Sequence, residues 1–228
     1  MSVETSVMRR GINSLRTVGV RHTLENVLCM LEEYWFEYRY GVESLAWHEK
    51  DALDLSSADI VHAHGYKPAR LTHFRHLIKR IPFPDNSTFV DFGSGKGRLL
   101  IAASQLGFQR AVGIELSSRL CATARLNIAR ATERRLPHHS IEVVECNALD
   151  YEIQPGENVF YFYNPFDDVI MGQVLGNIER SLEAHPRQAW LIYTNPRQAH
   201  LIEGGNVFTR QFSHQFGGSF AVVYSHAG

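Results

Sequence analysis

The sequence predicts an α/β fold: a three-layer, doubly wound, mostly parallel seven-stranded sheet with a C-terminal antiparallel hairpin and an N-terminal helical extension. From residue 88 onward, five β-rich apolar runs alternate with segments of helical periodicity, as in a parallel sheet covered on both faces. Two further β-rich runs, joined by a short link that contains glycines, predict the hairpin. We therefore divide the chain into an extension, residues 1–87, which is a candidate substrate-side lid, and a main domain, residues 88–228.

The extension begins with an Arg-rich segment, residues 1–21, which we expect to form a partly ordered leading helix; a targeting or membrane-surface helix is the alternative. Residues 23–40 predict an amphipathic helix with Thr23 as N-cap and Gly41 as C-terminal stop. We expect its aromatic-rich apolar stripe to pack in the core rather than to line a substrate cleft. The stripe consists of Leu24, Val27, Leu28, Leu31, Trp35 and Tyr38. Residues 42–65 are expected to form a loop or short helices.

A second helix is predicted after Tyr66, where apolar residues again recur at helical spacing until Pro82 stops the pattern. Its apolar positions are Leu71, Phe74, Leu77, Ile78 and Ile81. The opposite face is basic along residues 67–80, with Lys67, Arg70, Arg75, Lys79 and Arg80. Such a face is usually solvated, and contact with RNA, DNA or an acidic protein stays open.

The main domain is predicted to alternate between strands and helices. The expected strands are residues 89–92, 111–114, 141–145, 159–163 and 189–193, followed by the hairpin strands 208–212 and 220–224. The expected helices span residues 96–106, the Arg- and Ala-rich segment up to residue 135, and residues 169–182. Ligands of such sheets bind at the carboxyl ends of the strands, so the residues that follow each strand are the candidates for a site.

The turn after the first of these strands carries three glycines at alternate positions, in Asp91-Phe92-Gly93-Ser94-Gly95-Lys96-Gly97. Without Cβ atoms the backbone can approach a ligand closely, and the free N–H groups of the following helix attract anionic groups. The spacing differs from both the dinucleotide fingerprint and the phosphate-binding loop. An acidic side chain two residues before the first glycine suits a cofactor that carries an ammonium and a sulfonium.

This stretch resembles motif I of the class I S-adenosylmethionine (SAM) dependent methyltransferases, whose seven-stranded sheet has an antiparallel last strand. The second strand ends at Glu115, where a carboxylate can accept both ribose hydroxyls of an adenosyl group. The resemblance puts Asn147, after the third strand, at the adenine amino group. It implies SAM as the cofactor, bound by Asp91, Gly93, Ser94, Gly95, Gly97, Glu115, Leu116, Asn147, Ala148 and Asn164.

The fourth strand ends in Tyr163-Asn164-Pro165-Phe166, which resembles the [DN]-P-P-[FY] motif of nitrogen-directed methyltransferases with one proline missing. In that motif the polar side chain and a backbone carbonyl accept hydrogen bonds from the target amino group, and the aromatic residue stacks on the substrate. The histone-lysine methyltransferases without a SET domain, and related bacterial protein-lysine methyltransferases, also have an Asn followed closely by Phe at this point. The resemblance implies Asn164, Pro165 and Phe166 as catalytic residues.

The leading hypothesis is an enzyme that transfers a methyl group from SAM to nitrogen, with a protein lysine or another amine as acceptor. A lysine must first lose a proton, which a desolvated aromatic channel favours by lowering the lysine pKa. The candidate lining is Tyr161, Phe162, Tyr163 and Phe166, with Tyr66 or Trp35. The alternatives are methylation of an RNA or DNA base and a non-catalytic SAM-binding scaffold, while the glycine spacing disfavours an NAD-dependent oxidoreductase.

Composition sets wider limits. The chain has 228 residues, 44% of them apolar, and 23 Lys plus Arg against 24 Asp plus Glu, so no global field attracts it to nucleic acid or membrane. Three widely spaced cysteines imply no disulfide framework, and a reducing, cytoplasmic location is the simplest expectation. Because charges interrupt every apolar run, we expect no membrane span.

Four histidines lie close together in the extension, at His62, His64, His73 and His76. Their spacings match no common structural zinc pattern, and no cysteines accompany them. We therefore expect no metal site, although some of these imidazoles are candidates for the mouth of the cofactor site.

Overall fold

The structure is a computed structural model that describes residues 20–47, 49, 53–55, 65–134, 136–137 and 140–228. The strands are β1 (Thr88–Phe92), β2 (Arg110–Glu115), β3 (Ser140–Glu145), β4 (Glu157–Phe162), β5 (Ala189–Thr194), β6 (Thr209–Phe216) and β7 (Ser219–His226). The helices are α2 (Val20–Tyr40), α4 (Leu71–Ile78), α5 (Arg98–Gln105), α6 (Ser118–Glu133), α7 (Asp168–Ala184) and α8 (Ala199–Glu203).

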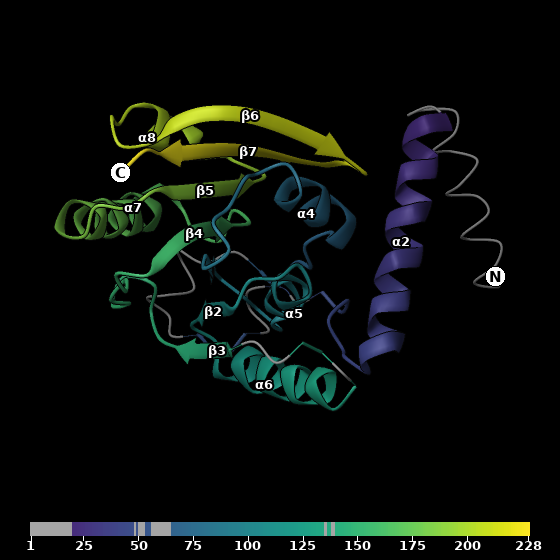
Figure 1. Cartoon of the computed structure of the whole chain (residues 1–228). Coiled ribbons are helices and arrows are strands. Elements are labelled where there is room, and N and C mark those ends of the chain that lie inside the picture. Colours follow the sequence, from purple (N-terminus) through teal and green to yellow (C-terminus); the bar gives the residue numbers. More distant parts are fainter. Residues whose placement is uncertain (1–19, 48, 50–52, 56–64, 135, 138–139) are drawn as a thin grey trace.

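All seven strands belong to one sheet with the order β3-β2-β1-β4-β5-β7-β6 (Figure 1). Strands β1 to β5 are parallel, and β7 is antiparallel to both β5 and β6. This arrangement confirms the predicted α/β sheet and its C-terminal hairpin. The hairpin strands are longer than expected, because only Gly217 and Gly218 form the turn. Both have positive φ angles, 55° and 78°, which a two-residue hairpin turn requires.

Helices cover both faces of the sheet. On one face α4 and α5 pack against residues such as Phe89 and Tyr161, and on the other α7 and α8 cover Phe92, Phe162 and Tyr193. Every residue of β4 and β5 is buried, which explains why these strands are continuous apolar runs rather than alternating patterns. The short helix α8 has no counterpart among the predicted elements.

The strand order reverses at β1, because β2 and β3 extend the sheet to one side and β4 and β5 to the other. In open α/β sheets the ligand crevice forms outside the carboxyl ends of the strands at such a reversal. The turns after β1 and β4 lie in contact there: a Cβ atom added to Gly93 would be 2.9 Å from the Cβ of Pro165.

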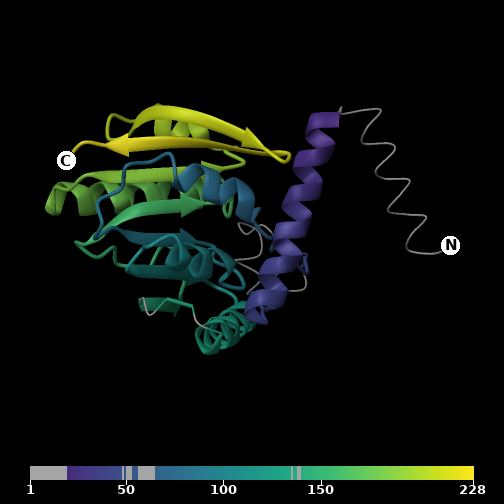
Figure 2. The same ribbon diagram turned by 45° about the vertical axis from the view of Figure 1, so that its right-hand side comes forward.

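The long helix α2 stands beside the tip of the β6–β7 hairpin in both views (Figures 1 and 2). Its inward side is narrow and buries Cys29, Phe36 and Tyr40. The stripe that we expected in the core is exposed, with fractional exposures of 59% for Leu24, 42% for Val27, 56% for Leu28, 57% for Leu31, 52% for Trp35 and 83% for Tyr38. That expectation was wrong because helical periodicity locates an apolar stripe without identifying what covers it. Helix α2 also starts before Thr23, so this residue does not cap it.

Charge pairing explains which side of α2 faces inward. Glu32 of α2 accepts a hydrogen bond from the Thr72 hydroxyl and forms an ion pair with Arg75, both on α4. A second nitrogen of Arg75 donates to Gln105 Oε1 at 2.7 Å. The basic face along residues 67–80 is therefore partly neutralised by α2 rather than uniformly solvated.

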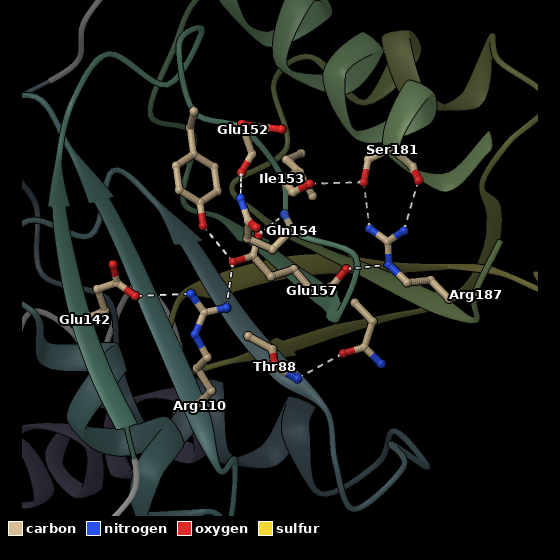
Figure 3. A network of polar contacts seen from close by, with 11 residues as sticks. Thr88, Arg110, Glu142, Glu152, Ile153, Gln154, Glu157, Ser181 and Arg187 are labelled. Carbon is tan, nitrogen blue, oxygen red and sulfur yellow. Dashed lines mark hydrogen bonds and ion pairs between the residues drawn. The ribbon is translucent and has the colours of Figure 1, made fainter. Parts of the chain in front are cut away.

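A buried carboxylate lies at the amino end of β4, at the opposite end of this strand from the glycine turn. Glu157, at the start of β4, is fully buried, and Figure 3 shows Arg110, Gln154 and Arg187 converging on it. Its Oε1 accepts from Arg110 at 3.0 Å and from the Tyr151 hydroxyl at 2.6 Å, and its Oε2 accepts from the Gln154 N–H at 3.0 Å. Arg187 donates to the Glu157 carbonyl at 2.8 Å. The three donors to the carboxylate offset the cost of burying its charge.

Within the described residues, no helix combines the length and the apolar character that crossing a membrane requires.

Removing the cation beside Glu157 is expected to destabilise the protein. Arg110→Met leaves the buried carboxylate without its ionic partner. We expect the free energy of unfolding to fall by about 2 to 3 kcal/mol. This is less than the cost for a wholly buried pair, because Arg110 is one-third exposed. Urea unfolding measures the change. The control is Glu142→Gln, which removes the exposed partner of Arg110 and is expected to cost under about 1 kcal/mol. Equal losses in the two variants would contradict this account.

Two adjacent aromatic residues test the orientation of α2. Phe36→Ala opens a cavity in the core and is expected to cost about 3 to 5 kcal/mol, whereas Trp35→Ala removes an exposed ring and is expected to cost under about 1 kcal/mol. Thermal and urea unfolding of both variants provide the comparison. A Trp35 variant as unstable as the Phe36 variant would show that the exposed stripe is packed.

Candidate functional site

A cavity of about 590 Å³ opens at the carboxyl end of the sheet, next to the point where the strand order reverses. Its volume is typical of small-molecule and cofactor sites. Residues following four neighbouring strands line it: Gly93 after β1, Glu115 at the end of β2, Asn147 after β3 and Asn164 after β4. The other wall comes from the N-terminal part of the chain, with Trp47, Glu49, Leu53, Leu55, Gly65, Tyr66 and Lys67.

The three glycines shape the turn between β1 and α5. Gly93, Gly95 and Gly97 have φ angles of 80°, 54° and 74°, in the left-handed region that side chains disfavour. A Cβ on Gly95 would collide with the ring of Tyr66, which lies directly over the turn. The glycine at position 95 is therefore required twice, by the backbone conformation and by the close approach of Tyr66.

Glu115 ties the glycine turn to the end of β2. Its Oε2 accepts from the Gly95 N–H at 2.8 Å, and its Oε1 accepts from the N–H groups of Leu116 and Ser117 at 2.9 and 3.0 Å. Burial raises the pKa of Glu115, and the backbone donors oppose this rise. A carboxylate has about four acceptor positions, so these three bonds leave capacity for a ligand hydroxyl.

The segment after α2 is held over the turn by polar contacts. The Tyr66 hydroxyl donates to the Ser44 carbonyl at 2.7 Å, and the buried Lys96 ammonium pairs with Glu43 at 2.8 Å. Asn127 on α6 donates to the carbonyls of both Glu43 and Lys96 at 3.0 Å. The N-terminal wall of the cavity is thus hydrogen-bonded to the glycine turn between β1 and α5.

A smaller annex of about 30 Å³ adjoins the main cavity, and the two share Gly93, Tyr66, Lys67 and Tyr163. The annex is also lined by Asp91, Ser94, Arg98 and Tyr161. Asp91 is 4% exposed, and burial, with a smaller effect of the Glu115 charge, raises its pKa to about 8. The carboxyl group of Asp91 is therefore largely protonated at neutral pH until a cation approaches it.

Asn164 occupies a strained position at the start of the turn after β4. Its φ angle is 44°, a conformation that asparagine tolerates better than most residues, and its side chain is buried. Two acceptors compete for the single proton of the Tyr193 hydroxyl: Asn164 Oδ1 at 3.3 Å and the nearer Gln198 Oε1. Pro165 and Phe166 follow Asn164 along the cavity wall.

The structure brings most of the predicted site residues to one place. The main cavity is lined by Gly93, Glu115, Leu116, Asn147, Ala148, Asn164, Pro165 and Phe166. Asp91 and Ser94 line the annex instead, and Gly95 and Gly97 shape the turn. Asn147 also stabilises its own turn, because its Oδ1 accepts from the Leu149 N–H at 3.0 Å. Their roles toward a ligand stay predictions.

The aromatic lining differs from the predicted set. Phe162 lies in the core, stacked on Phe92 with ring centroids 4.9 Å apart, and Trp35 is on the outer side of α2. Tyr161 reaches only the annex. The main cavity has Tyr66, Tyr163 and Phe166 as expected, together with Trp47, which follows α2 in a stretch without periodicity.

Two cationic residues of the site had little or no signal in the sequence. Arg197 lines the main cavity from the loop after β5, where no motif marks it. Arg98 had a weak signal, since it is a charged residue at the start of the otherwise apolar helix α5.

The histidines lie elsewhere. His73 stacks on His214 at 5.4 Å, and His76 packs edge-on against Phe216, so both face β6 rather than the cavity. Burial lowers the pKa of His73 to about 4. His62 and His64, the other two histidines of this group, lie outside the described residues. Among the described residues, no group of three or more His, Cys, Asp or Glu side chains is arranged to hold a metal ion.

A central segment of the chain matches a protein-family model. Residues 61–154 match the family described as histone methylation protein DOT1. The matched part contains the glycine turn, Glu115 and Asn147, and it ends before Asn164. No similar protein was found among curated sequences.

Solved structures share the fold at low sequence identity. An RNA methyltransferase from Salinibacter ruber, in complex with S-adenosyl-L-homocysteine, superposes with a TM-score of 0.51 and 18% identity, covering 70% of this chain and 94% of that one. The ribosomal protein L11 methylase from Lactobacillus delbrueckii subsp. bulgaricus gives 0.55 and 17%, covering 72% and 81%. A SAM-dependent methyltransferase candidate from Methanococcus maripaludis gives 0.52 and 16%, covering 68% and 83%.

These comparisons and the sheet topology define the class: the chain has the fold of the class I SAM-dependent methyltransferases. Within that class, its resemblance to the DOT1 family covers the part of the chain that builds the glycine turn and the neighbouring strands.

The raised pKa of Asp91 predicts a pH-dependent stability. The folded protein keeps the Asp91 proton up to a pH of about 8, whereas an unfolded chain loses it near about pH 4, so the folded state binds more protons between these values. The contribution of this group to stability therefore falls as pH rises through that window. Asp91→Asn removes the effect, so we expect the variant to gain stability over the wild type between about pH 5 and 8.

Urea unfolding of both proteins across this pH range measures the difference. Asp85→Asn, at an exposed turn, is the control and is expected to run parallel to the wild type. A pH profile for the Asp91 variant that is also parallel would show that Asp91 is ionised in the folded protein.

Proposed function

We propose that the protein is a SAM-dependent methyltransferase that acts on nitrogen, with a protein lysine or another amine as acceptor. The observation that carries the proposal is the cavity where the strand order reverses, because it combines the glycine turn with Glu115, Asn147 and Asn164 from four neighbouring strands. The resemblance of residues 61–154 to the DOT1 family supports the same function.

The residues present fit SAM. Glu115 retains acceptor capacity for a ribose hydroxyl, and Gly93 presents bare backbone between the main cavity and the annex. Asp91 is a buried carboxyl group that a neighbouring ammonium would ionise. When bound, SAM supplies a methyl group on a positively charged sulfur.

Asn164 would position the acceptor. An amide oxygen accepts two hydrogen bonds, so Asn164 Oδ1 has room for one from the acceptor amine, which aims the lone pair of the amine, beside its 3.3 Å contact with the Tyr193 hydroxyl. Methyl transfer from a sulfonium produces a neutral leaving group, so orientation matters more than stabilisation of a new charge. The aromatic side chains of Tyr66, Tyr163 and Phe166 exclude water and favour the neutral form of a lysine.

A nucleic-acid base is the second candidate acceptor. Lys67 and Arg197 are exposed and line the cavity, where they suit a phosphate backbone. The fold itself accommodates both acceptor classes, because one similar structure is an RNA methyltransferase and another a ribosomal protein methylase. We favour a protein acceptor because Glu32 already engages Arg75 of the basic helix and the net charge is −1. A cytoplasmic location stays a prediction.

Variants at two ends of the cavity are expected to behave differently. Glu115→Gln removes the charge that holds both the turn and a ribose hydroxyl, so we expect SAM affinity to fall by about tenfold or more. Asn164→Ala is expected to reduce turnover while leaving SAM affinity within about threefold, because its role concerns the acceptor. Calorimetric titration measures the affinities, and transfer of tritiated methyl groups to fractionated protein and RNA measures turnover.

The outcomes separate the hypotheses. Label in protein that is lost in Asn164→Ala supports the proposed function, and label confined to RNA supports the second candidate. Titratable SAM binding with no transfer to either fraction would favour a scaffold. Absence of SAM binding by the folded wild type would overturn the enzyme proposal.

A further inference from the structure

Arg98 is buried without the partners that a guanidinium normally has. It is the first residue of α5 and is 2% exposed. Its Nε, Nη1 and Nη2 are all buried, and none of them has a hydrogen-bond partner among the described residues. The face of the Phe36 ring lies 5.7 Å from the guanidinium carbon, and the charges of Glu33, Glu37 and Glu32 on α2 also favour the guanidinium without bonding to it. The α2 carboxylates offset part of the charge, but buried N–H groups without acceptors are costly, so this arrangement is explained best by a ligand that supplies the missing acceptors.

A second buried donor lies in the same annex. The hydroxyl oxygen of Ser94 is also buried and has no partner within the described part of the chain. Both residues line the annex, Ser94 from the glycine turn and Arg98 from the first turn of α5. A group with two acceptor oxygens and a negative charge would satisfy a guanidinium and a hydroxyl together.

The annex continues from the main cavity across Gly93. If Glu115 holds the ribose in the main cavity, the annex beyond Gly93, about 30 Å³ in volume, has room for one charged group of the amino-acid end of SAM. That end carries an ammonium and a carboxylate on one carbon. Asp91 lines the same annex as Arg98. The Asp91 carboxyl group is thus available to the ammonium of SAM, and the Arg98 guanidinium is available to its carboxylate.

We infer that Arg98, assisted by Ser94, binds the α-carboxylate of SAM in the annex. This inference rests on the proposed function and adds a residue that discriminates between cofactor analogues. The other cations nearby are less suited. Lys96 is already paired with Glu43 at 2.8 Å, and Lys67 is exposed, where water screens its charge.

The test compares SAM with decarboxylated SAM, which keeps the adenosyl group, the sulfonium and the amine but lacks the carboxylate. Calorimetric titration of the wild type is expected to show SAM binding about tenfold or more tightly, as expected for a charge-assisted pair. Arg98→Met keeps the bulk of the side chain and removes its charge. We expect this variant to bind the two compounds equally, with its affinity for decarboxylated SAM within about threefold of the wild type.

Two further variants serve as controls for Arg98→Met. Arg98→Lys keeps a positive charge and is expected to recover part of the preference for SAM. Lys67→Met removes the exposed cation of the same annex and is expected to keep the preference. Thermal unfolding of ligand-free Arg98→Met is expected to give a melting temperature close to that of the wild type, because the removal of three unsatisfied buried donors offsets the lost attraction to Glu33.

Each alternative result has a distinct meaning. If the wild type binds SAM and decarboxylated SAM equally, this inference is overturned while the proposed function stands, and that result needs no variant to fold. If Arg98→Met keeps the preference, or weakens both compounds to the same degree, Arg98 does not bind the carboxylate. A preference lost in Lys67→Met would assign the carboxylate to Lys67. If the wild type binds neither compound, the proposed function fails as well.

Discussion

The arrangement of the site depends on the carboxylate of Glu115. This side chain accepts from the N–H of Gly95 and from two backbone N–H groups of its own strand end. It therefore joins the turn after β1 to the end of β2, at the point where the sheet presents its ligand crevice. The same turn contacts Pro165 after β4 and supports Tyr66 from the N-terminal part. Three backbone donors hold this half-buried carboxylate in place and oppose the rise in its pKa that desolvation causes.

The sequence was sufficient to predict the sheet, because the patterns that mark strands and turns are local in the chain. Apolar runs such as those of β4 and β5 are continuous because both faces are buried, and the alternate glycines mark a turn with three positive φ angles. The clustering of Glu115, Asn147 and Asn164 followed from one rule, that the carboxyl ends of parallel strands share an edge. Their positions around one cavity agree with that rule.

Features that depend on distant partners were missed. The stripe on α2 has the spacing of a core face, but the acidic side of the helix turns inward because Glu32 meets Arg75 and Thr72 of α4. Nothing local to residues 23–40 carries that information. Arg98 is similar: its position after the last glycine is visible in the sequence, but its burial without partners depends on Phe36, Tyr66 and the annex. Trp47 reaches the cavity through a segment without periodicity.

The contact between Tyr66 and Gly95 has a consequence for how this sequence can vary through evolution. The ring of Tyr66 occupies the space that a side chain at position 95 would need, and its hydroxyl is bonded to the Ser44 carbonyl. Because the positive φ of Gly95 disfavours a side chain whatever the space, a smaller residue at 66 would not free position 95, and it would release the segment around Ser44. The ring at position 66 therefore depends on glycine at position 95, 29 positions further along the chain.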